Sequence, residues 1–530
     1  MKKTVISLSL AATLIGSSAA WAADPSLGVV GENGQLLSSV QTSAGSGEVG
    51  TDDGTGTTVK FRNPNGLLTM PDGSVLVSDE KNQRIRKWTN GSVQTYAGVT
   101  FKVDSYGNPI GGFIEGKLRA SMFNHPAGLS ADAFGNIYVA DAENHAVRKI
   151  DAGGNVLTLA GDGVLGFKDG QGKTAQFYMP TDVAATEDGI VYVADTLNHV
   201  IRKIAEDGTV TTLTGLSKRT VAVAPGQASP AGDYKDGKIS EALFNEPSGL
   251  ALDSNGNLYV SDKGNQRIRY IDFTKGEVTT IAGSARADLA NTYGIGELYA
   301  PGDFSDGDAS QAMFNFPKGI AITPEGGLLI ADSMNHSIRY LLDGKVTTVA
   351  GDLRHLSGKA DGIERAARLN APSDVAVLAD GSILVADTYN NQLRQIVPYR
   401  FPADLEQDDT LKVFKGNERI VFDAQPEISN GRTMVPVRAV TESLGFEVSF
   451  DDQNGVVKIA KNGVAIELTI AQPKMRKTDR NGKTIEKEID VSPYIQSDRT
   501  YVPLRFFSEE LGLDVQWNGE HRAVIVRPKQ

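Results

Sequence analysis

The sequence of 530 residues contains no cysteine, so disulfide bonds, thiolate metal sites and cysteine nucleophiles are all excluded. Disulfides stabilise mainly small domains, whereas a chain of this length can form a core that holds it together by packing alone. Histidine is also scarce, with six residues in the whole chain. Imidazole metal sites therefore have few candidates.

A stripe of positive charge is missing as well. The formal net charge is -12, and acidic and basic residues are interspersed along the chain. Without clustered basic residues to neutralise phosphates, nucleic acid is not expected as a partner. After residue 15 no apolar run approaches the roughly 20 residues that a membrane span needs. We therefore expect no membrane span.

The first residues have the layout of a secretory signal peptide. Lys2 and Lys3 precede an apolar run at residues 5–15, and small residues surround Trp21 before Ala22. A signal peptide of this kind, residues 1–22, would be cleaved near Ala22. The sequence thus predicts an exported protein, either secreted or associated with the cell envelope.

A short motif recurs six times. Its clearest copy is LYVSDKGNQRIRYI at residues 258–271: a short apolar strand ends in Asp, a three-residue corner ends in Asn, and a second strand carries Arg. The corner residues are Asp79, Asp141, Asp195, Asp262, Asp332 and Asp387, each followed three residues later by Asn82, Asn144, Asn198, Asn265, Asn335 or Asn390.

The motif belongs to a longer unit that begins with an Asp-Gly loop and ends with a VTTxAG strand. Four strands per unit with Gly-rich turns are typical of a β-propeller blade. The sixth unit lacks its last strand, and an isolated VQTSAG segment at residues 40–45 can supply it. We therefore predict a mainly β fold: a six-bladed β-propeller closed by an N-terminal strand, so that no sheet edge stays free.

The repeated patterns F-N-x-P-x-G-L and L-Y-V-A-D-x-x-N-H-x-I-R-K-I resemble the NHL repeat family of six-bladed propellers, over residues 38–398. The resemblance implies a fold and a tendency to bind proteins or other ligands through one face. It implies no particular activity, because propellers include both binding proteins and enzymes.

Residues beyond 410 follow a different pattern, an internal duplication at an offset of 67 residues. The segment RTMVPVRAVTESLGFEVSF at residue 432 is echoed by RTYVPLRFFSEELGLDVQW at residue 499. This part resembles the copper amine oxidase N-terminal domain, which implies a small α+β module. His521 is its only histidine, so too few ligands are present for copper. The predicted organisation is a flexible lead-in at 23–37, the propeller at 38–398, a linker at 399–410 and the C-terminal domain at 411–530.

Internal symmetry separates structural residues from candidate functional ones. A residue present in every blade performs a structural task, whereas a functional constellation is built once. Corner Asp and Asn side chains are therefore expected to bond nearby backbone amides, and the repeated Arg is expected to pair with a carboxylate or a carbonyl. These arginines are Arg86, Arg148, Arg202, Arg269, Arg339 and Arg394.

Three histidines, His145, His199 and His336, directly follow the corner Asn, where the other blades have Gln or Asn. Three imidazoles could ligate zinc around the propeller axis. Amide side chains at the equivalent positions indicate instead that a polar group is tolerated and no metal is required. We expect no metal and no cofactor, and these histidines are the ligands only in the alternative hypothesis of a metal-dependent propeller lyase or hydrolase.

Long loops between blades carry aromatic residues, and long loops on a rigid scaffold are where binding usually resides. We predict binding without catalysis, with an extracellular protein or cell-wall polymer as the partner. The C-terminal module would be a spacer or envelope-docking unit; a third hypothesis makes it the wall-binding part and the propeller a passive scaffold. The candidate ligand-binding residues are Phe101, Tyr106, Phe113, Tyr234, Tyr293, Tyr299 and Phe304.

Overall fold

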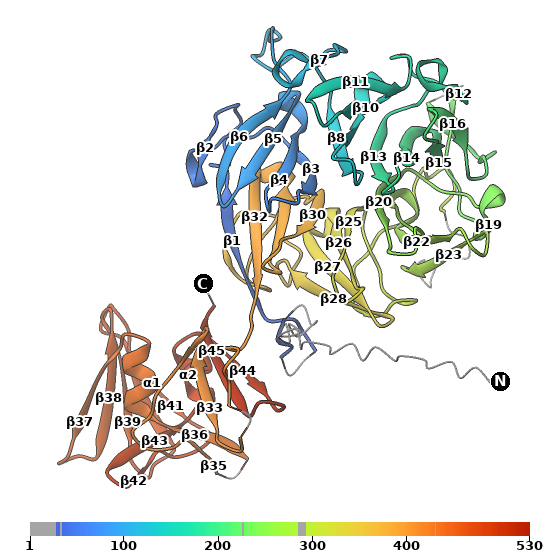
Figure 1. The fold of residues 1–530 in the computed structure, drawn as a ribbon. Helices are drawn as coiled ribbons and strands as arrows, with labels where there is room; N and C mark the ends of the chain where they lie inside the picture. The colour runs from blue at the N-terminus through green and yellow to red at the C-terminus, as the bar shows by residue number, and fades with distance from the viewer. Residues whose placement is uncertain are drawn as a thin grey trace, which may run out of the picture.

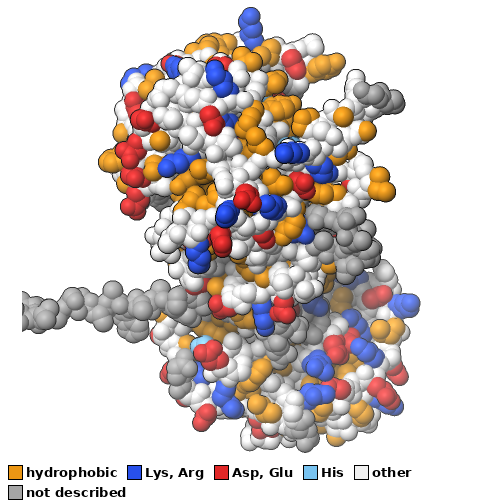
Figure 2. Space-filling model, turned by 90° about the vertical axis from the view of Figure 1, so that its right-hand side faces the viewer, with side chains coloured by type: hydrophobic (Ala, Val, Ile, Leu, Met, Phe, Trp, Pro, Cys, Tyr) orange, Lys and Arg blue, Asp and Glu red, His pale blue; other side chains and the backbone are white. Residues whose placement is uncertain are grey.

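The computed structural model describes residues 28–31, 34–224, 227–284, 293–406, 408–429 and 431–529. Within them the chain forms a ring of β-sheets and a smaller C-terminal domain beside the ring (Figure 1). The helices in this part of the chain are too short or too polar to cross a membrane. Acidic, basic and apolar side chains are interspersed over the face shown in Figure 2, as the sequence suggests. The predicted signal peptide lies outside the described residues.

The first three sheets of the ring follow one another along the chain. Each has five strands, and its first strand has only two residues. The first sheet is β2 (Gly54–Thr55), β3 (Pro64–Thr69), β4 (Val75–Asp79), β5 (Arg84–Thr89) and β6 (Ser92–Ala97); the second is β7 (Gly116–Lys117), β8 (Pro126–Ala131), β9 (Ile137–Asp141), β10 (Ala146–Ile150) and β11 (Asn155–Ala160); the third is β12 (Gly170–Gln171), β13 (Pro180–Ala185), β14 (Val191–Asp195), β15 (Val200–Ile204) and β16 (Thr209–Thr212).

The remaining three sheets repeat this plan, with a separate hairpin of β17 (Thr220–Ala224) and β18 (Gln227–Pro230) in between. The fourth sheet is β19 (Gly237–Lys238), β20 (Pro247–Leu252), β21 (Leu258–Asp262), β22 (Arg267–Asp272) and β23 (Glu277–Ala282); the fifth is β24 (Gly307–Asp308), β25 (Pro317–Ile322), β26 (Leu328–Asp332), β27 (Ser337–Leu342) and β28 (Lys345–Ala350); the sixth is β29 (Gly362–Ile363), β30 (Asp374–Val377), β31 (Ile383–Asp387), β32 (Gln392–Pro398) and β1 (Ser38–Ala44).

Strand β1 completes the sixth sheet. It pairs antiparallel with β32, Val40 opposite Ile396, and with the short β29 on its other side. In Figure 1 the first and last strands of the ring lie side by side, and the innermost strands contact one another in the closed order β3, β8, β13, β20, β25, β30 and back to β3. The predicted fold class is confirmed. The two-residue strand at the outer edge of each blade was not predicted.

The corners repeat one hydrogen-bond network. In the fourth blade, Oδ2 of Asp262 accepts bonds from Asn265 (2.8 Å) and Arg269 (2.6 Å), while Oδ1 accepts the backbone N–H of Asn245 (2.8 Å). All six repeated arginines are buried and pair with their own corner Asp. A buried ion pair is tolerated when further hydrogen bonds support both partners. The other Arg269 donors bond two backbone carbonyls and the outer-loop carboxylate of Asp236 (2.9 and 2.6 Å). The structural role predicted for these residues is confirmed.

Short 3-10 helices form the corners and the outer turns of the blades. Corner helices are η2 (Glu80–Asn82), η4 (Ala142–Asn144), η6 (Thr196–Asn198), η8 (Lys263–Asn265), η9 (Ser333–Asn335) and η10 (Thr388–Asn390). The outer ones are η1 (Gly56–Thr58), η3 (Leu118–Ala120), η5 (Gly172–Thr174) and η7 (Ile239–Glu241). Each corner helix ends in a residue with left-handed backbone, which turns the chain into the next strand.

The C-terminal domain contains two short helices among three sheets. Gly445 and Gly512 follow the helices with positive φ, as predicted. The helices are α1 (Val437–Ser443) and α2 (Arg505–Glu510). The sheets are β34 (Glu418–Arg419), β33 (Lys412–Lys415), β45 (Ala523–Pro528), β44 (Leu513–Asn518); β35 (Glu427–Ser429), β36 (Arg432–Pro436), β43 (Arg499–Pro503), β42 (Tyr494–Gln496); and β37 (Glu447–Asp451), β38 (Val456–Lys461), β39 (Val464–Thr469), β40 (Lys474–Thr478), β41 (Thr484–Glu488).

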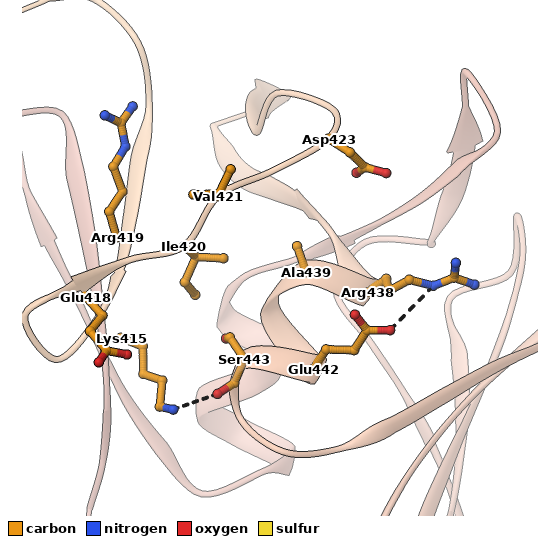
Figure 3. A pocket seen from close by; sticks show the side chains of 10 residues that line it. All are labelled: Lys415, Glu418, Arg419, Ile420, Val421, Asp423, Arg438, Ala439, Glu442 and Ser443. Atoms are coloured by element: carbon orange, nitrogen blue, oxygen red, sulfur yellow. Dashed lines mark hydrogen bonds and ion pairs between the residues drawn. The ribbon is translucent and has the colours of Figure 1, made fainter.

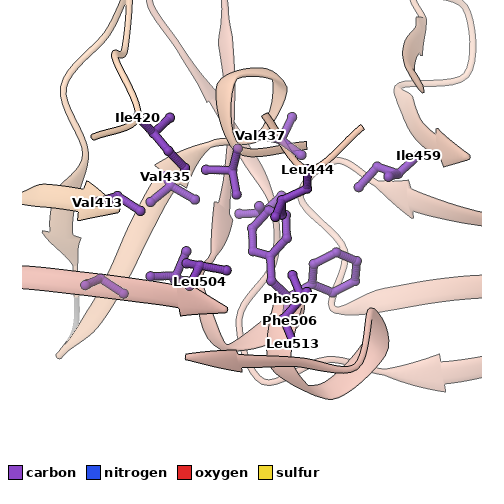
Figure 4. Packing of buried hydrophobic residues seen from close by; sticks show 14 of the residues in the cluster. Val413, Ile420, Val435, Val437, Leu444, Ile459, Leu504, Phe506, Phe507 and Leu513 are labelled. Atoms are coloured by element: carbon purple, nitrogen blue, oxygen red, sulfur yellow. The ribbon is translucent and has the colours of Figure 1, made fainter. Parts of the chain in front are cut away.

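The two sequence copies share one hydrophobic core in this domain (Figure 4). The copies meet where β36 pairs with β43, Val435 opposite Val502. Both residues are completely buried, as is Phe507 of α2. The module therefore has a core of its own, separate from the cores of the propeller blades.

The C-terminal domain docks against the sixth blade. Arg527 forms a bidentate ion pair with Glu364 (3.0 and 2.8 Å), and their side chains are 7% and 5% exposed. Glu364 also accepts the backbone N–H of Ser38 at the start of β1 (2.9 Å). One carboxylate thus links the closing strand to the second domain.

Part of the segment expected to be a flexible lead-in is built into this junction. Leu37 packs with Tyr399 and Ile525, and Val29 donates a backbone hydrogen bond to Tyr399 (2.8 Å). Tyr399, the first residue of the predicted linker, is buried, whereas residues 403–404 are exposed. Apolar contacts with both domains therefore fix part of the predicted lead-in and the first residue of the predicted linker. The predicted domain boundaries themselves stay predictions.

Candidate functional site

Three positions recur in every blade beside the corner, where the Pro at the start of the innermost strand pairs with the corner Asp in blades one to five. They are the residue after the corner Asp, the residue before the repeated Pro, and the residue after that Pro. Glu80, His125, Glu246, Lys263 and Lys318 are charged or titratable residues at these positions, where most blades have small or neutral ones. We call these five residues the channel-mouth cluster. They come from blades one, two, four and five.

The residue after each corner Asn bonds the next blade. Its side chain accepts the backbone N–H of the residue before the repeated Pro, so each blade is tied to its neighbour. The six bonds run from Asn63 to Asn391 (2.9 Å), His125 to Gln83 (2.6 Å), Met179 to His145 (3.3 Å), Glu246 to His199 (3.1 Å), Phe316 to Gln266 (2.5 Å) and Ala371 to His336 (3.0 Å). The imidazole Nδ1 and the amide oxygen thus both act as the acceptor of this hydrogen bond between blades.

The three histidines of the alternative hypothesis therefore hold three separate junctions. Each accepts through Nδ1, so the ring must be neutral to make the bond. Burial lowers the pKa of all three, that of His199 to about 4. The described residues include no group of three or more His, Cys, Asp or Glu side chains that could hold a metal ion. The structure does not bring His145, His199 and His336 together.

Three of the predicted aromatic residues occupy one repeated position, which the sequence analysis missed. The Arg148 guanidinium lies over Phe113 (4.8 Å), Arg269 over Tyr234 (4.9 Å) and Arg339 over Phe304 (4.2 Å). Phe167 covers Arg202 in the same way (5.1 Å). Each aromatic residue lies two positions before the acidic residue of the outer loop. These rings cover the repeated arginines, so the argument that they are unique to single loops does not hold for them.

Tyr299 is the predicted aromatic residue that reaches the channel-mouth cluster. Its hydroxyl donates to Glu246 (2.8 Å), and its ring meets Phe316 edge to face at 5.0 Å. Tyr293 donates to the corner Asn265 and lies beneath the guanidinium of Arg219 (3.7 Å). Both tyrosines thus lie at the corner face, as predicted for their loop. Their role in binding stays a prediction.

Phe101 and Tyr106 lie apart from these tyrosines, in the loop between the first two blades. Phe101 is 67% exposed and Tyr106 87% exposed. The backbone of this loop is fixed by Asp104, which accepts the N–H of Tyr106 and of Asn108 (2.8 Å each). The two rings are presented to solvent by an ordered loop. Nothing in their surroundings assigns them a structural task.

Ion pairs organise the channel-mouth cluster. Lys263 contacts Glu246 at 2.6 Å, with both side chains mostly buried. His125 contacts Glu80 at 3.1 Å. Burial opposes ionisation of His125, but the hydrogen bond and charge of Glu80 outweigh it and raise its pKa. Asn65 also donates to Glu80 (2.7 Å). Both carboxylates thus have partners within the protein.

Lys318 is the exception among these residues. It lies on the innermost strand β25, and no hydrogen bond or ion pair joins its ammonium to another described residue. Burial and the charge of Lys263 together lower the pKa of Lys318 to about 8, although Glu80 acts in the opposite direction. Those two residues come from blades four and one, and Lys318 comes from blade five. Corner groups of different blades thus approach Lys318 near the channel axis.

Two acidic residues line the channel below the mouth. Asp182 and Asp374 stand where the other four blades have Gly, on strands β13 and β30 that lie opposite each other in the ring. Each carboxylate accepts an amide from the following blade, Leu250 (2.8 Å) or Leu67 (2.7 Å). Burial raises the pKa of Asp374 to about 7, and the charge of Asp374 adds to the effect of burial on Asp182.

Glycine in the preceding blade makes room for these carboxylates. A Cβ on Gly128 would lie 1.8 Å from Oδ1 of Asp182, and one on Gly319 would lie 2.0 Å from Oδ1 of Asp374. No side chain could occupy either place without displacing the acid. The order Gly, Gly, Asp occurs twice around the ring, so each of the two acids follows a blade that has Gly at the same position.

The described residues also form two pockets that lie away from the channel mouth. One of about 440 Å³ lies between turns of the first, fifth and sixth blades, at the end of the channel away from the corners, and Met70, Ile322 and Leu378 line it. The other, of about 450 Å³, lies in the C-terminal domain between α1 and the segment around Ile420 (Figure 3). Ala439 lies on its α1 side, where the second sequence copy has the buried Phe506.

Sequence reasoning missed the channel-mouth cluster, although a signal was present. Comparing the blades position by position shows Lys318 among Asn65, Ala127, Thr181, Ser248 and Ser373. The same comparison shows Glu80 and Lys263 among Ala, Thr and Ser residues. Internal symmetry excludes the repeated residues as functional candidates. It also identifies the residues that break the repeat.

Comparisons with known protein families match both parts of the chain. The NHL repeat model matches residues 123–150, 244–269, 314–339 and 369–396. The copper amine oxidase N-terminal domain model matches residues 414–526. Both resemblances drawn from the motifs are confirmed by these matches. The copper amine oxidase name describes that family and not a chemistry of this chain.

Curated relatives and solved structures are similar to part of the chain. The chain is 30% identical to Protein SUPPRESSOR OF QUENCHING 1, chloroplastic, of Arabidopsis thaliana over 304 residues, 54% of the chain and 26% of that protein. It is 29% identical to NHL repeat-containing protein 2 of Bos taurus over 417 residues, which cover 72% of the chain and 53% of that protein. A structural genomics protein of unknown function from Bacteroides thetaiotaomicron covers 68% of the chain, and 76% of its own, at 18% identity and a TM-score of 0.48. The chain thus spans about a quarter and about half of these two curated relatives, and its propeller carries NHL repeats.

Proposed function

We propose that this protein is an exported binding protein whose propeller recognises an extracellular protein or cell-wall polysaccharide at the corner end of its channel. The C-terminal domain would act as a spacer or as the unit that docks the protein on the cell envelope. The observation that carries the proposal is the meeting of Glu80, Glu246, Lys263 and Lys318, which come from blades one, four and five, at one end of the channel.

The repeated polar residues make the contacts that recur in every blade, whereas the side chains of these four residues do not take part in those repeated contacts. Corner Asp, Asn and Arg residues satisfy one another, and the His, Gln or Asn after each corner holds the next blade. Residues that change from blade to blade are free of those tasks. A rigid ring that presents a few polar groups at fixed positions suits recognition, since little ordering is needed when a ligand binds.

The signal-peptide layout of residues 1–22 supports export, and the absence of cysteine is compatible with an oxidising compartment. The metal-dependent lyase or hydrolase remains the alternative function. Its proposed ligands, His145, His199 and His336, each serve a different blade junction. This arrangement favours binding over metal catalysis at those residues.

The test is retention on isolated bacterial cell-wall fragments, measured by co-sedimentation of the mature protein. The double variant Glu246→Gln/Lys263→Met neutralises the ion pair at the mouth without leaving one charge unpaired. A matched control is Glu241→Gln/Lys235→Met, which removes an exposed pair of the same type (2.9 Å) near the same blade. We expect the first variant to lose at least about tenfold in retention and the control to bind as the wild type.

Two results would overturn the proposal. One is equal retention of both double variants, with thermal unfolding showing that both are folded. The other is a stoichiometric metal in the purified protein that is lost, together with a lyase or hydrolase activity, when His145, His199 and His336 are replaced by Gln. That second result would establish the enzyme.

A further inference from the structure

No carboxylate of the described residues forms a direct ion pair with the ammonium of Lys318, although Glu80 acts on it electrostatically. This defines the chemistry that the channel mouth can recognise. The nearby carboxylate of Glu246 already contacts Lys263 and Tyr299, and that of Glu80 contacts His125 and Asn65. Both acids therefore have internal donors. A lysine at this position is unique among the six blades.

A partly buried cation without a partner is costly unless something supplies the opposite charge. The low pKa of Lys318 agrees with this, because burial and Lys263 both disfavour its charged form. An anionic group entering the mouth would reverse the effect by favouring the protonated amine. A ligand anion beside Lys318 would therefore supply the negative charge that is missing at the mouth.

The surrounding acids restrict the charge of that anion. Glu80 acts on Lys318 electrostatically, Glu246 lies beside Lys263, and Asp374 crosses over Gly319, the residue after Lys318. Each would repel a second negative charge on the one ligand group that contacts Lys318. A singly charged carboxylate is therefore favoured over a doubly charged phosphate.

We propose that Lys318 anchors a carboxylate group of the ligand at the corner end of the channel. This inference rests on the proposed function, because it assigns the ligand chemistry of the same site. The ion pair Glu246–Lys263 and the ring of Tyr299 would form the side of the site next to the anchor. An acidic polysaccharide would present such groups along its length.

The experiment measures binding of trigalacturonate to the mature protein by calorimetry, with its fully methyl-esterified form as the uncharged match. Variants are Lys318→Met, Lys318→Arg and, as a control, Lys238→Met, which removes an exposed lysine on the edge strand β19. We expect Lys318→Met to weaken trigalacturonate at least about tenfold and the ester to bind the wild type equally weakly. Lys318→Arg and Lys238→Met should stay within about threefold of the wild type.

A pH series adds a second readout. Affinity for trigalacturonate should fall as the pH rises above about 8, where the amine of Lys318 loses its proton, and Lys318→Arg should abolish this dependence. Three results would overturn the proposal: no carboxylate-dependent binding by the wild type, unchanged affinity of Lys318→Met, or tighter binding of inorganic phosphate than of trigalacturonate. The last would reassign the site to phosphate.

The two proposals fail in different ways. If Lys318→Met keeps full retention on wall fragments while the Glu246→Gln/Lys263→Met variant loses it, the proposed function stands and the carboxylate anchor is wrong. If trigalacturonate binds in a Lys318-dependent way but wall fragments are not retained by the wild type, the anchor stands and the envelope role is wrong.

Discussion

The side-chain oxygen of Asn391, in the last blade, accepts a hydrogen bond of 2.9 Å from the backbone N–H of Asn63, in the first. The same bond joins every other pair of neighbouring blades, made by Gln or His instead of Asn. It lies at the corner face, whereas strand β1 closes the ring at the outer side of the sixth blade. The junction between the first and last blades is thus held both by this hydrogen bond and by the pairing of β1 with β32.

Deleting residues 23–46 tests the closing strand. Removal of β1 leaves β32 and the short β29 without their partner, and Glu364 loses the amide of Ser38. An exposed sheet edge promotes association with other chains. We expect the deletion variant to lose most of a stability that is about 5–15 kcal/mol for a typical domain and to aggregate. Thermal unfolding and light scattering check this, and an unchanged transition would contradict closure by β1.

Replacing His145, His199 and His336 together by Gln tests the blade junctions. At pH 7 we expect a change of no more than about 1 kcal/mol in the free energy of unfolding, because the Gln oxygen can accept the same amide. Replacing the three by Leu instead leaves three amides unpaired and should cost several kcal/mol, at about 1–3 kcal/mol for each. Urea unfolding of both variants gives the comparison.

Acid should affect the wild type more than the Gln variant. Burial lowers the pKa of His199 from 6.5 to about 4, so between these values the unfolded chain binds a proton that the folded chain does not. The stability that neutral His199 contributes is therefore complete above pH 6.5 and falls as the pH drops towards 4. At pH 5 the loss from this residue is about 2 kcal/mol. Equal pH profiles of wild type and variant would show that the histidines titrate normally.

Arg527→Leu tests the docking of the C-terminal domain. It leaves Glu364 buried without its bidentate partner. Breaking a buried ion pair by removing one member typically costs about 3–5 kcal/mol, and we expect faster proteolysis at the exposed residues 403–404. The double variant Glu364→Gln/Arg527→Leu removes both charges and should recover much of the loss. A double variant as unstable as the single one would indicate that packing, and not charge, is responsible.

The isolated segment 405–530 should fold by itself. Its core of residues from both sequence copies, including Val435, Val502 and Phe507, does not depend on the propeller. Separation exposes Ile525 and Arg527, so we expect cooperative unfolding at a lower temperature than in the whole protein. Calorimetry of the fragment decides the matter, and a transition without cooperativity would place the domain boundary elsewhere.

Ala439→Phe should fill the cavity beside α1. The second copy has Phe506 at the equivalent position, 4% exposed, and burying such a ring contributes about 1.5–3 kcal/mol where it fits without strain. Phe506→Ala, the reverse change, should cost about 3–5 kcal/mol. In a Trp88→Phe background the fluorescence of Trp517 reports unfolding of this domain. A destabilised Ala439→Phe variant would show that the two copies do not pack equivalently there.

Three of the predicted ligand-binding aromatic residues belong to the repeat. Phe113, Tyr234 and Phe304 lie in long loops, but their fixed distance from the outer acidic residue marks them as repeated. Phe167, in a short loop, has the same role over Arg202. Loop length is a property of the local chain. The contacts of these rings, in contrast, are made with the buried Arg of each blade.

The sequence by itself determined the propeller, the closing strand, the corner networks and the duplicated C-terminal domain, because each is a local pattern repeated at fixed spacing. Only the tertiary structure decided that Glu80, Lys263 and Lys318 meet. Their sequence separations carry no such information, since the meeting results from blades arranged around one axis. The same holds for Arg527 and Glu364, which belong to different domains and are brought together by a junction that apolar side chains from both domains bury.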